Sequence, residues 1–224
     1  MAVTDEAIST IKAMIVSGEL KPGQRLPPEK ELSERLGLSR NSLREAVKSL
    51  EVIRVLDVRR GDGTFVTSLE PHLLLEAMSF VVDLHQDSSV LEIFEVRRVL
   101  EPFAAGLAAA RITAEQLDAL AATLDSVNES TPVEELVEHD LEFHRLITEA
   151  SGNAYLSSLV ESMSSSTIRA RIWRGITQDD ATERTLNEHA AILDALRNHD
   201  VERTESSLAA HVGGIVAWLQ RAIS

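Results

Sequence analysis

The chain has 224 residues, a formal net charge of −14, 44% hydrophobic residues and no cysteine. This length fits one large or two modest domains, and the absence of cysteine excludes disulfides and thiolate metal sites. The sequence has no run of about 18 apolar residues that could span a membrane, and its polar N-terminus has no signal-peptide core. We therefore expect a cytoplasmic protein with no membrane contact.

Charge is divided unevenly along the chain. Residues 1–68 carry 11 Lys and Arg against 10 Asp and Glu, whereas residues 69–224 carry 11 Arg, no Lys and 26 Asp and Glu. An acidic protein can still bind DNA if its positive charge is gathered on one module. We therefore predict a DNA-binding domain over residues 1–68 and a second domain over residues 69–224.

The first domain is predicted to contain three helices. Residues 4–16 have isoleucines on one side of a helix, at Ile8, Ile11 and Ile15. Pro28 suits the start of a second helix, Gly37 can adopt the left-handed conformation that ends it, and Ser39 is a good N-cap for a third. The third helix then has an inward apolar stripe, formed by Leu43, Val47 and Leu50.

The exposed side chains of this third helix suit DNA recognition. Its first turns leave Arg40, Asn41, Ser42 and Arg44 facing outward. A recognition helix contacts base edges with its N-terminal residues, and Arg and Asn suit guanine and adenine. A glycine turn over residues 59–63 then predicts a β-hairpin whose arginines reach DNA. An ordinary helical hairpin with a solvated basic face is the alternative, but the ordered set of features favours a winged helix-turn-helix.

Beyond the wing the pattern is helical and no strand is expected. We predict seven helices, over residues 71–85, 89–109, 114–127, 132–150, 154–173, 179–198 and 201–222. The fold class is therefore mainly α: an N-terminal winged helix-turn-helix with a small β-hairpin wing, followed by an all-α seven-helix bundle.

The bundle contains a candidate metal site. Asp140 and His144 are four residues apart, which places both on one helix face. His189 and His211 each lie beside an apolar stripe and can point inward. One carboxylate and three imidazoles would suit a divalent ion such as zinc, nickel or manganese. A solvated Asp–His pair and two satisfied core histidines would explain the same pattern.

Three further polar residues of the bundle are of interest, one with two possible partners and two expected at the surface. Arg97 lies on an apolar stripe, where it either pairs with an acid such as Glu101 or binds a ligand carboxylate. His139 and His199 lack inward placement, and we expect them at the surface.

These motifs resemble a known family. LKPGQRLPPEKELSERLGLSRNSLREAVKSLE, followed by RRGDGTFV, resembles the DNA-binding domain of the GntR family of bacterial transcription regulators. The later motifs EVRRVLEP, DLEFH and EHAAILDAL are similar to the FCD ligand-sensing domain of its FadR subfamily. The predicted helix over 71–85 favours the seven-helix FadR-like branch. The resemblance implies a homodimer that binds a near-palindromic, double-stranded DNA operator.

The resemblance also assigns residues. The DNA contacts of the family fall on Lys30, Ser39, Arg40, Arg44, Arg60 and Gly61. Its metal ligands fall on Asp140, His144, His189 and His211, with zinc as the first choice of ion. A small organic acid effector would bind this metal near Arg97, whereas the branch that binds fatty acyl-CoA lacks these histidines.

The chain departs from the family pattern at three positions. Lys30 replaces the usual Arg and gives a point charge rather than a bidentate fork. Arg54 stands where Gly is common, and Asp62 stands in the wing turn where a basic or neutral residue is common. These departures affect the expected phosphate contacts and the end of the third helix.

The sequence thus predicts a ligand-responsive regulator, by the family trend a repressor, and not an enzyme. Its DNA affinity would be modulated by a small carboxylate bound at the metal. Two alternatives are a metal-dependent hydrolase and a constitutive regulator whose metal is purely structural.

Overall fold

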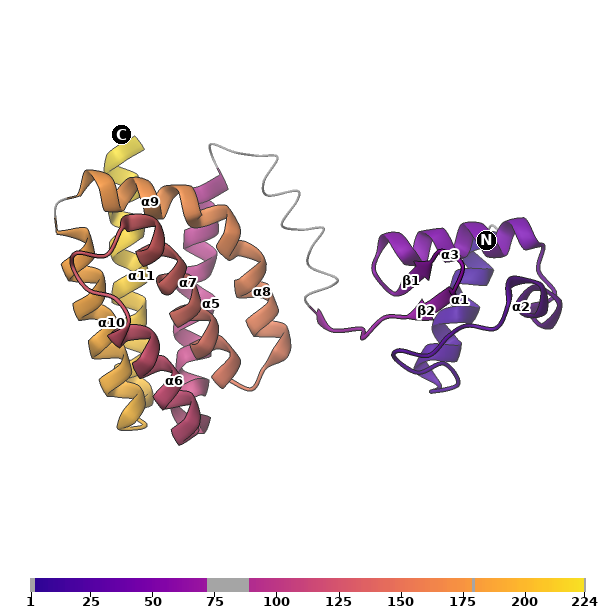
Figure 1. The fold of residues 1–224 in the computed structure, drawn as a ribbon, viewed down its shortest axis with the longest axis horizontal. Coiled ribbons are helices and arrows are strands. Elements are labelled where there is room, and N and C mark those ends of the chain that lie inside the picture. Colours follow the sequence, from indigo (N-terminus) through magenta and orange to yellow (C-terminus); the bar gives the residue numbers. More distant parts are fainter. Residues whose placement is uncertain (1–2, 72–88, 179, 224) are drawn as a thin grey trace. The chain divides into compact units, whose positions relative to one another are not determined.

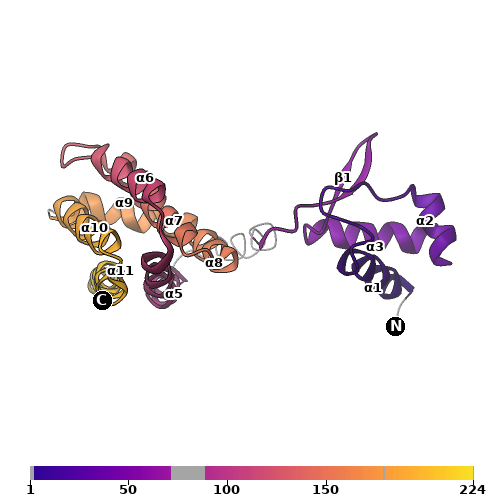
Figure 2. The same ribbon diagram turned by 90° about the horizontal axis from the view of Figure 1, so that it is seen from below.

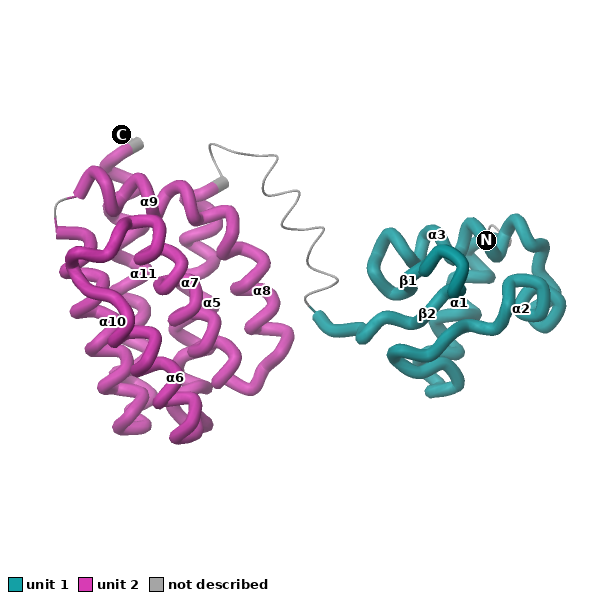
Figure 3. Tube along the Cα trace, viewed as in Figure 1, with its two compact units in different colours: residues 1–77 teal, residues 78–224 magenta. Residues whose placement is uncertain are grey.

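In a computed structural model the chain forms two compact units, residues 1–77 and 78–224 (Figure 3). The structure describes residues 3–71, 89–178 and 180–223. The predicted helix over 71–85 falls outside the described residues except for its first position. The boundary between the units falls there as well, so the predicted division at residue 68 stays a prediction.

The described part of the first unit, residues 3–71, contains three helices and a two-stranded hairpin (Figure 1). The helices are α1 (Val3–Val16), α2 (Glu29–Leu36) and α3 (Arg40–Val52). Strands β1 (Leu56–Arg59) and β2 (Gly63–Val66) pair antiparallel, with Leu56 opposite Val66. Apolar residues from all these elements form one core, including Ile11, Leu32, Leu43, Leu50, Leu56 and Val66. The predicted winged helix-turn-helix architecture is confirmed.

Local backbone signals explain the turn between α2 and α3. Gly37 follows α2 in the left-handed conformation, with φ 67°. The Ser39 hydroxyl accepts a hydrogen bond from the Ser42 backbone N–H at 3.1 Å, so it caps α3 as predicted. Arg54, just beyond α3, has φ 57°, a backbone region that glycine enters without steric cost. This conformation gives a physical reason why glycine is common there in the family.

The described part of the second unit contains seven α-helices and one short 3-10 helix. They are α5 (Ser89–Arg111), α6 (Ala114–Asp125), α7 (Val133–Ala150), α8 (Ala154–Ser164), η1 (Ser165–Thr167), α9 (Ile168–Thr177), α10 (Ala181–Arg197) and α11 (Val201–Ile223). Helices α5 and α11 pack side by side (Figure 2). The mainly helical class is confirmed, and none of the described helices is long and apolar enough to span a bilayer.

The single helix predicted over residues 154–173 is wrong. The chain ends α8 at Ser164, passes through η1 and starts α9 at Ile168. Ser164 Oγ donates to the Val160 carbonyl at 3.0 Å, and Thr167 Oγ1 donates to the Ser164 carbonyl at 2.7 Å. Such local bonds favour bends in helices. Figure 1 shows that α9 runs in a different direction from α8.

Candidate functional site

The first turns of α3 present the polar side chains predicted to read DNA. Arg40, Asn41 and Arg44 are exposed, and Ser42 is half-buried. Arg44 Nη2 donates to Glu29 Oε2 at 3.0 Å. This hydrogen bond raises the pKa of the Arg44 guanidinium. The side chain is therefore oriented by α2 while it remains accessible to a ligand in solution.

The wing is a tight turn stabilised by its own side chains. Gly61 has φ 81°, and the Asp62 N–H donates to the Arg59 carbonyl at 3.1 Å. The Arg59 guanidinium lies 4.3 Å from the Phe65 ring centre and also donates to Asp57. Arg60 and Gly61 are exposed at the turn, and Lys30 is exposed on α2. The residues predicted to contact DNA are thus accessible at the surface, apart from half-buried Ser42.

The four predicted metal ligands come together inside the helical unit. Asp140 and His144 lie on α7, His189 on α10 and His211 on α11. All four are buried, and one potential ligand atom from each lies within 4.8 Å of the others. Three helices that are distant in sequence therefore contribute to one cluster.

The spacing of these atoms fits a single ion. Asp140 Oδ1 lies 3.3 Å from His189 Nε2 and 3.7 Å from the Nε2 atoms of His144 and His211. The two latter nitrogens are 3.2 Å apart. Neighbouring atoms bound at about 2.1 Å to one zinc ion are separated by about 3.0–3.4 Å. Only small movements would be needed to close the cluster around a metal.

Two carboxylates from outside the cluster lie against two of its three imidazoles. Glu101, on α5, lies in contact with His144 Nδ1, and Glu188 Oε2 lies 2.8 Å from His211 Nδ1. A carboxylate on one ring nitrogen fixes the tautomer and directs the other nitrogen toward a metal. The four residues therefore form a donor set that could hold a metal ion, with carboxylates placed to orient two of its imidazoles.

The protonation states also suit metal binding. Burial lowers the pKa of His144, His189 and His211, which favours neutral imidazoles. Burial opposes ionisation of Glu101, but Arg97 and His144 together hold its pKa below the usual range. His189 Nε2 is buried without a hydrogen-bond partner in the described part of the chain. A buried acceptor of this kind is satisfied if it binds an ion.

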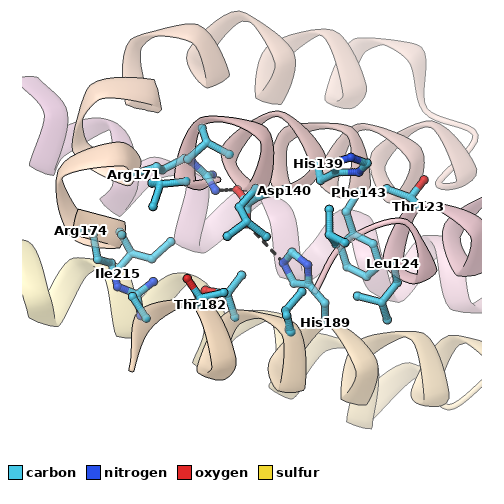
Figure 4. Close-up of a pocket in the computed structure, with 18 residues that line it drawn as sticks. Thr123, Leu124, His139, Asp140, Phe143, Arg171, Arg174, Thr182, His189 and Ile215 are labelled. Atoms are coloured by element: carbon cyan, nitrogen blue, oxygen red, sulfur yellow. Dashed lines mark ion pairs between the residues drawn. The ribbon is translucent and has the colours of Figure 1, made fainter. Parts of the chain in front are cut away.

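A pocket leads to this cluster (Figure 4). Its cavity volume is about 60 Å³, and the larger empty space of about 680 Å³ around it includes open solvent. Asp140 and His189 form part of its wall. Arg171 of α9 also lines the pocket and forms an ion pair with Asp140 Oδ2. A small ligand in this pocket would lie beside two of the four cluster residues.

Arg97 lies behind the cluster rather than in the pocket wall. Its side chain is fully buried, forms an ion pair with Glu101 and donates to Thr167 Oγ1 at 2.9 Å. The ion pair considered from the sequence is therefore present. His139, expected at the surface, is instead half-buried and lines the pocket.

Sequence reasoning missed Arg171, Arg174 and Glu188. The two arginines line the pocket from α9, but the predicted helix over 154–173 concealed where α9 begins. Their spacing of three residues, which places both on one helix face, was the available signal. Glu188 directly precedes His189, so its contact with His211 depends on the packing of α10 against α11.

Comparisons with known proteins give a family match for each of the two units. Residues 3–66 match the bacterial regulatory proteins of the gntR family, and residues 92–214 match the FCD domain. The chain is 31% identical over 211 residues to the galactonate operon transcriptional repressor of Escherichia coli K12, covering 91% of each chain. It is 29% identical over 208 residues to the regulator LutR of Bacillus subtilis, covering 90% of this chain and 94% of LutR.

A solved structure also shares the fold over nearly the whole chain. The GntR protein of Streptococcus agalactiae superposes with a TM-score of 0.74 at 27% identity, covering 96% of this chain and 99% of the other. The matched relatives are named as regulators rather than enzymes. With its exposed recognition helix and its FCD domain, the chain belongs to the GntR family of bacterial transcription regulators.

Proposed function

We propose that this regulator binds its operator as a homodimer and senses a small carboxylate at a divalent metal. The metal would be held by Asp140, His144, His189 and His211, with zinc as the first choice. The proposal depends chiefly on one observation: four buried ligand atoms converge, and carboxylates orient two of the imidazoles. A divalent ion there would supply a Lewis acid that binds a carboxylate oxygen.

The pocket supports a small effector. Arg171 lies in its wall beside Asp140, and Arg171 Nη2 is buried without a hydrogen-bond partner in the described residues. A guanidinium in this position can donate to an effector carboxylate. The direct effector contact predicted for Arg97 stays a prediction, because Arg97 is fully buried and does not line the pocket. In our proposal Arg97 also positions His144 through Glu101.

The first unit would read the operator. Arg40, Asn41 and Arg44 would contact base edges in the major groove, while Ser39, Ser42, Lys30, Arg60 and Gly61 would contact the DNA backbone or groove edges. A homodimer would present two recognition helices to two half-sites. Repression is favoured because a relative at 31% identity is named a transcriptional repressor. That relative is named for galactonate, which is itself a carboxylate.

Effector binding would change operator affinity only through its differential affinity for two conformations. The test combines metal analysis of purified protein with thermal shifts caused by a panel of small carboxylates, with and without chelator. We expect about one metal per chain and an acid whose stabilisation disappears on chelation. The same acid should change operator affinity in fluorescence anisotropy, and the primary amide of that acid is the matched control.

Other outcomes separate the alternatives. Metal without any acid response, together with chelator-induced unfolding, would indicate a structural metal and a constitutive regulator. The metal centre would be refuted if the purified protein contained no metal and its melting temperature did not change on adding zinc, nickel or manganese. The four residues would then be buried polar residues of the core. Turnover of a carboxylate ester or amide by the metal-loaded protein would favour a hydrolase.

A further inference from the structure

Arg174 is a second cation of the pocket, and it has no role in the cluster described above. It lies one helical turn after Arg171 on α9, lines the same pocket and is only 5% exposed. Its Nε donates to Gln178 Oε1 at 3.1 Å. Among the described residues it forms no ion pair, in contrast to Arg97 with Glu101 and Arg171 with Asp140.

This arrangement leaves buried positive charge unbalanced. Burial lowers the pKa of Arg174, while Glu188 acts in the opposite direction without direct contact. The pocket wall contains two guanidinium groups and one carboxylate, Asp140, which already pairs with Arg171. A divalent ion on the cluster would add further positive charge. A buried charge without a partner is costly, so a bound anion near Arg174 would stabilise the structure.

A ligand that placed one anionic group at the metal and another at Arg174 would have its middle part against the rest of the pocket wall. The side chains of that wall indicate the chemistry of this middle part. Most lining side chains are apolar, among them Leu124, Leu136 and Ile215, and the hydroxyl groups of the wall belong to threonines such as Thr182. In the view of Figure 4, Arg174 and His189 are separated along the pocket, with Thr182 between them. A ligand with an anionic group at each end and a short, mainly hydrocarbon centre matches this pattern.

We propose that Arg174 forms a second anion subsite, so that the effector is a dicarboxylate rather than a monocarboxylate. This inference rests on the proposed function, because the first carboxylate would occupy the site beside the metal and Arg171. The guanidinium of Arg174 would donate bidentate hydrogen bonds to the second carboxylate. The mainly apolar wall favours a hydrocarbon centre over a heavily hydroxylated one, because only the threonine hydroxyls of the lining could pair with ligand hydroxyls.

The test uses the full-length, zinc-loaded protein and acids matched in carbon number. Succinate, glutarate and adipate are compared with butyrate, pentanoate and hexanoate by thermal shift and isothermal titration calorimetry. We expect at least one dicarboxylate to bind at least about tenfold tighter than the monocarboxylate of equal length. Arg174→Gln should reduce this preference to less than about threefold. Arg174→Lys, which keeps the charge, should retain part of it.

The matched control is Arg169→Gln, which removes the same charge from an exposed position on the same helix. It should keep the full preference for the dicarboxylate. A normal response to zinc and chelator in Arg174→Gln would show that the variant is folded, because Arg174 supplies no atom to the metal cluster.

The outcomes distinguish this inference from the proposed function. Equal binding of mono- and dicarboxylates, with both dependent on metal, would overturn the second subsite and leave the carboxylate sensor intact. Retention of the preference in Arg174→Gln would overturn the assignment to Arg174. No binding of either series would overturn the carboxylate sensor and the second subsite together.

Discussion

Truncation of His189 gives the sharpest test of the metal centre. The variant His189→Ala removes one of the four proposed ligand atoms and also a ring that stacks on Phe143, with ring centres 4.2 Å apart. It therefore has two effects on stability. One is the loss of packing, which is present with or without metal, and the other is the loss of metal affinity.

The size of the metal effect can be worked out by linkage. A metal present at about 1,000 times its dissociation constant stabilises the folded state by about 4 kcal/mol. For a protein of this size, about 1 kcal/mol changes the melting temperature by about 2–4 °C. Chelation should therefore lower the melting temperature of the unmodified protein by about 8–16 °C. Loss of a ligand should weaken affinity by at least about 100-fold, since even outer-shell changes cost 10–100-fold.

In His189→Ala the remaining stabilisation should be at most about 1.4 kcal/mol, or about 3–6 °C, at the same metal concentration. The assay is differential scanning calorimetry of each protein with zinc and with chelator. The packing defect cancels in the difference between the two scans. The control is His199→Asn, which removes an imidazole outside the cluster while asparagine tolerates the left-handed backbone at that residue, φ 53°. A chelator effect in His189→Ala as large as in the unmodified protein would refute the metal centre.

Three further predictions concern other parts of the chain. Arg44→Ala should weaken specific operator binding by about 1–3 kcal/mol per half-site in fluorescence anisotropy, with an unchanged circular dichroism spectrum; equal loss on random DNA would contradict base readout. Thr113→Ala removes the capping box at the start of α6 and should cost about 1 kcal/mol in urea unfolding; an unchanged midpoint would show that this cap does not contribute. Arg54→Gly should raise the stability of the first unit by about 1 kcal/mol by relieving its positive φ, and a lower midpoint would mean that the Arg54 side chain contributes more than the backbone strain costs.

The sequence predicted those features that depend on neighbouring residues. The end of α2 at Gly37 and the cap of α3 at Ser39 are both local, because a left-handed glycine and a hydroxyl acceptor need no distant partner. The same holds for Thr113 and Asn153, whose side chains cap α6 and α8 through bonds to residues three positions later. Such signals operate within one turn of helix, so the elements they delimit can be placed from sequence alone.

The site could be predicted only in part. Spacing paired Asp140 with His144, but nothing in the sequence alone required His189 and His211 to meet them; family resemblance supplied that expectation. The contact of Glu188 with His211 and the position of Arg171 depend on how separate helices pack. At the break before α9, hydroxyl side chains form hydrogen bonds to the backbone. The spacing of apolar residues, from which the helices were predicted, contains no information about such bonds.

That break has an evolutionary consequence. Helix α9 contributes two guanidinium groups to the pocket wall but no ligand atom to the cluster, which is built from α7, α10 and α11. Substitutions on α9 can therefore change the charge and shape of the pocket while the four residues of the cluster stay intact. Under the proposed function, a gene duplicate could acquire a new effector through changes within the ten residues of α9, without rebuilding the cluster or the core around it.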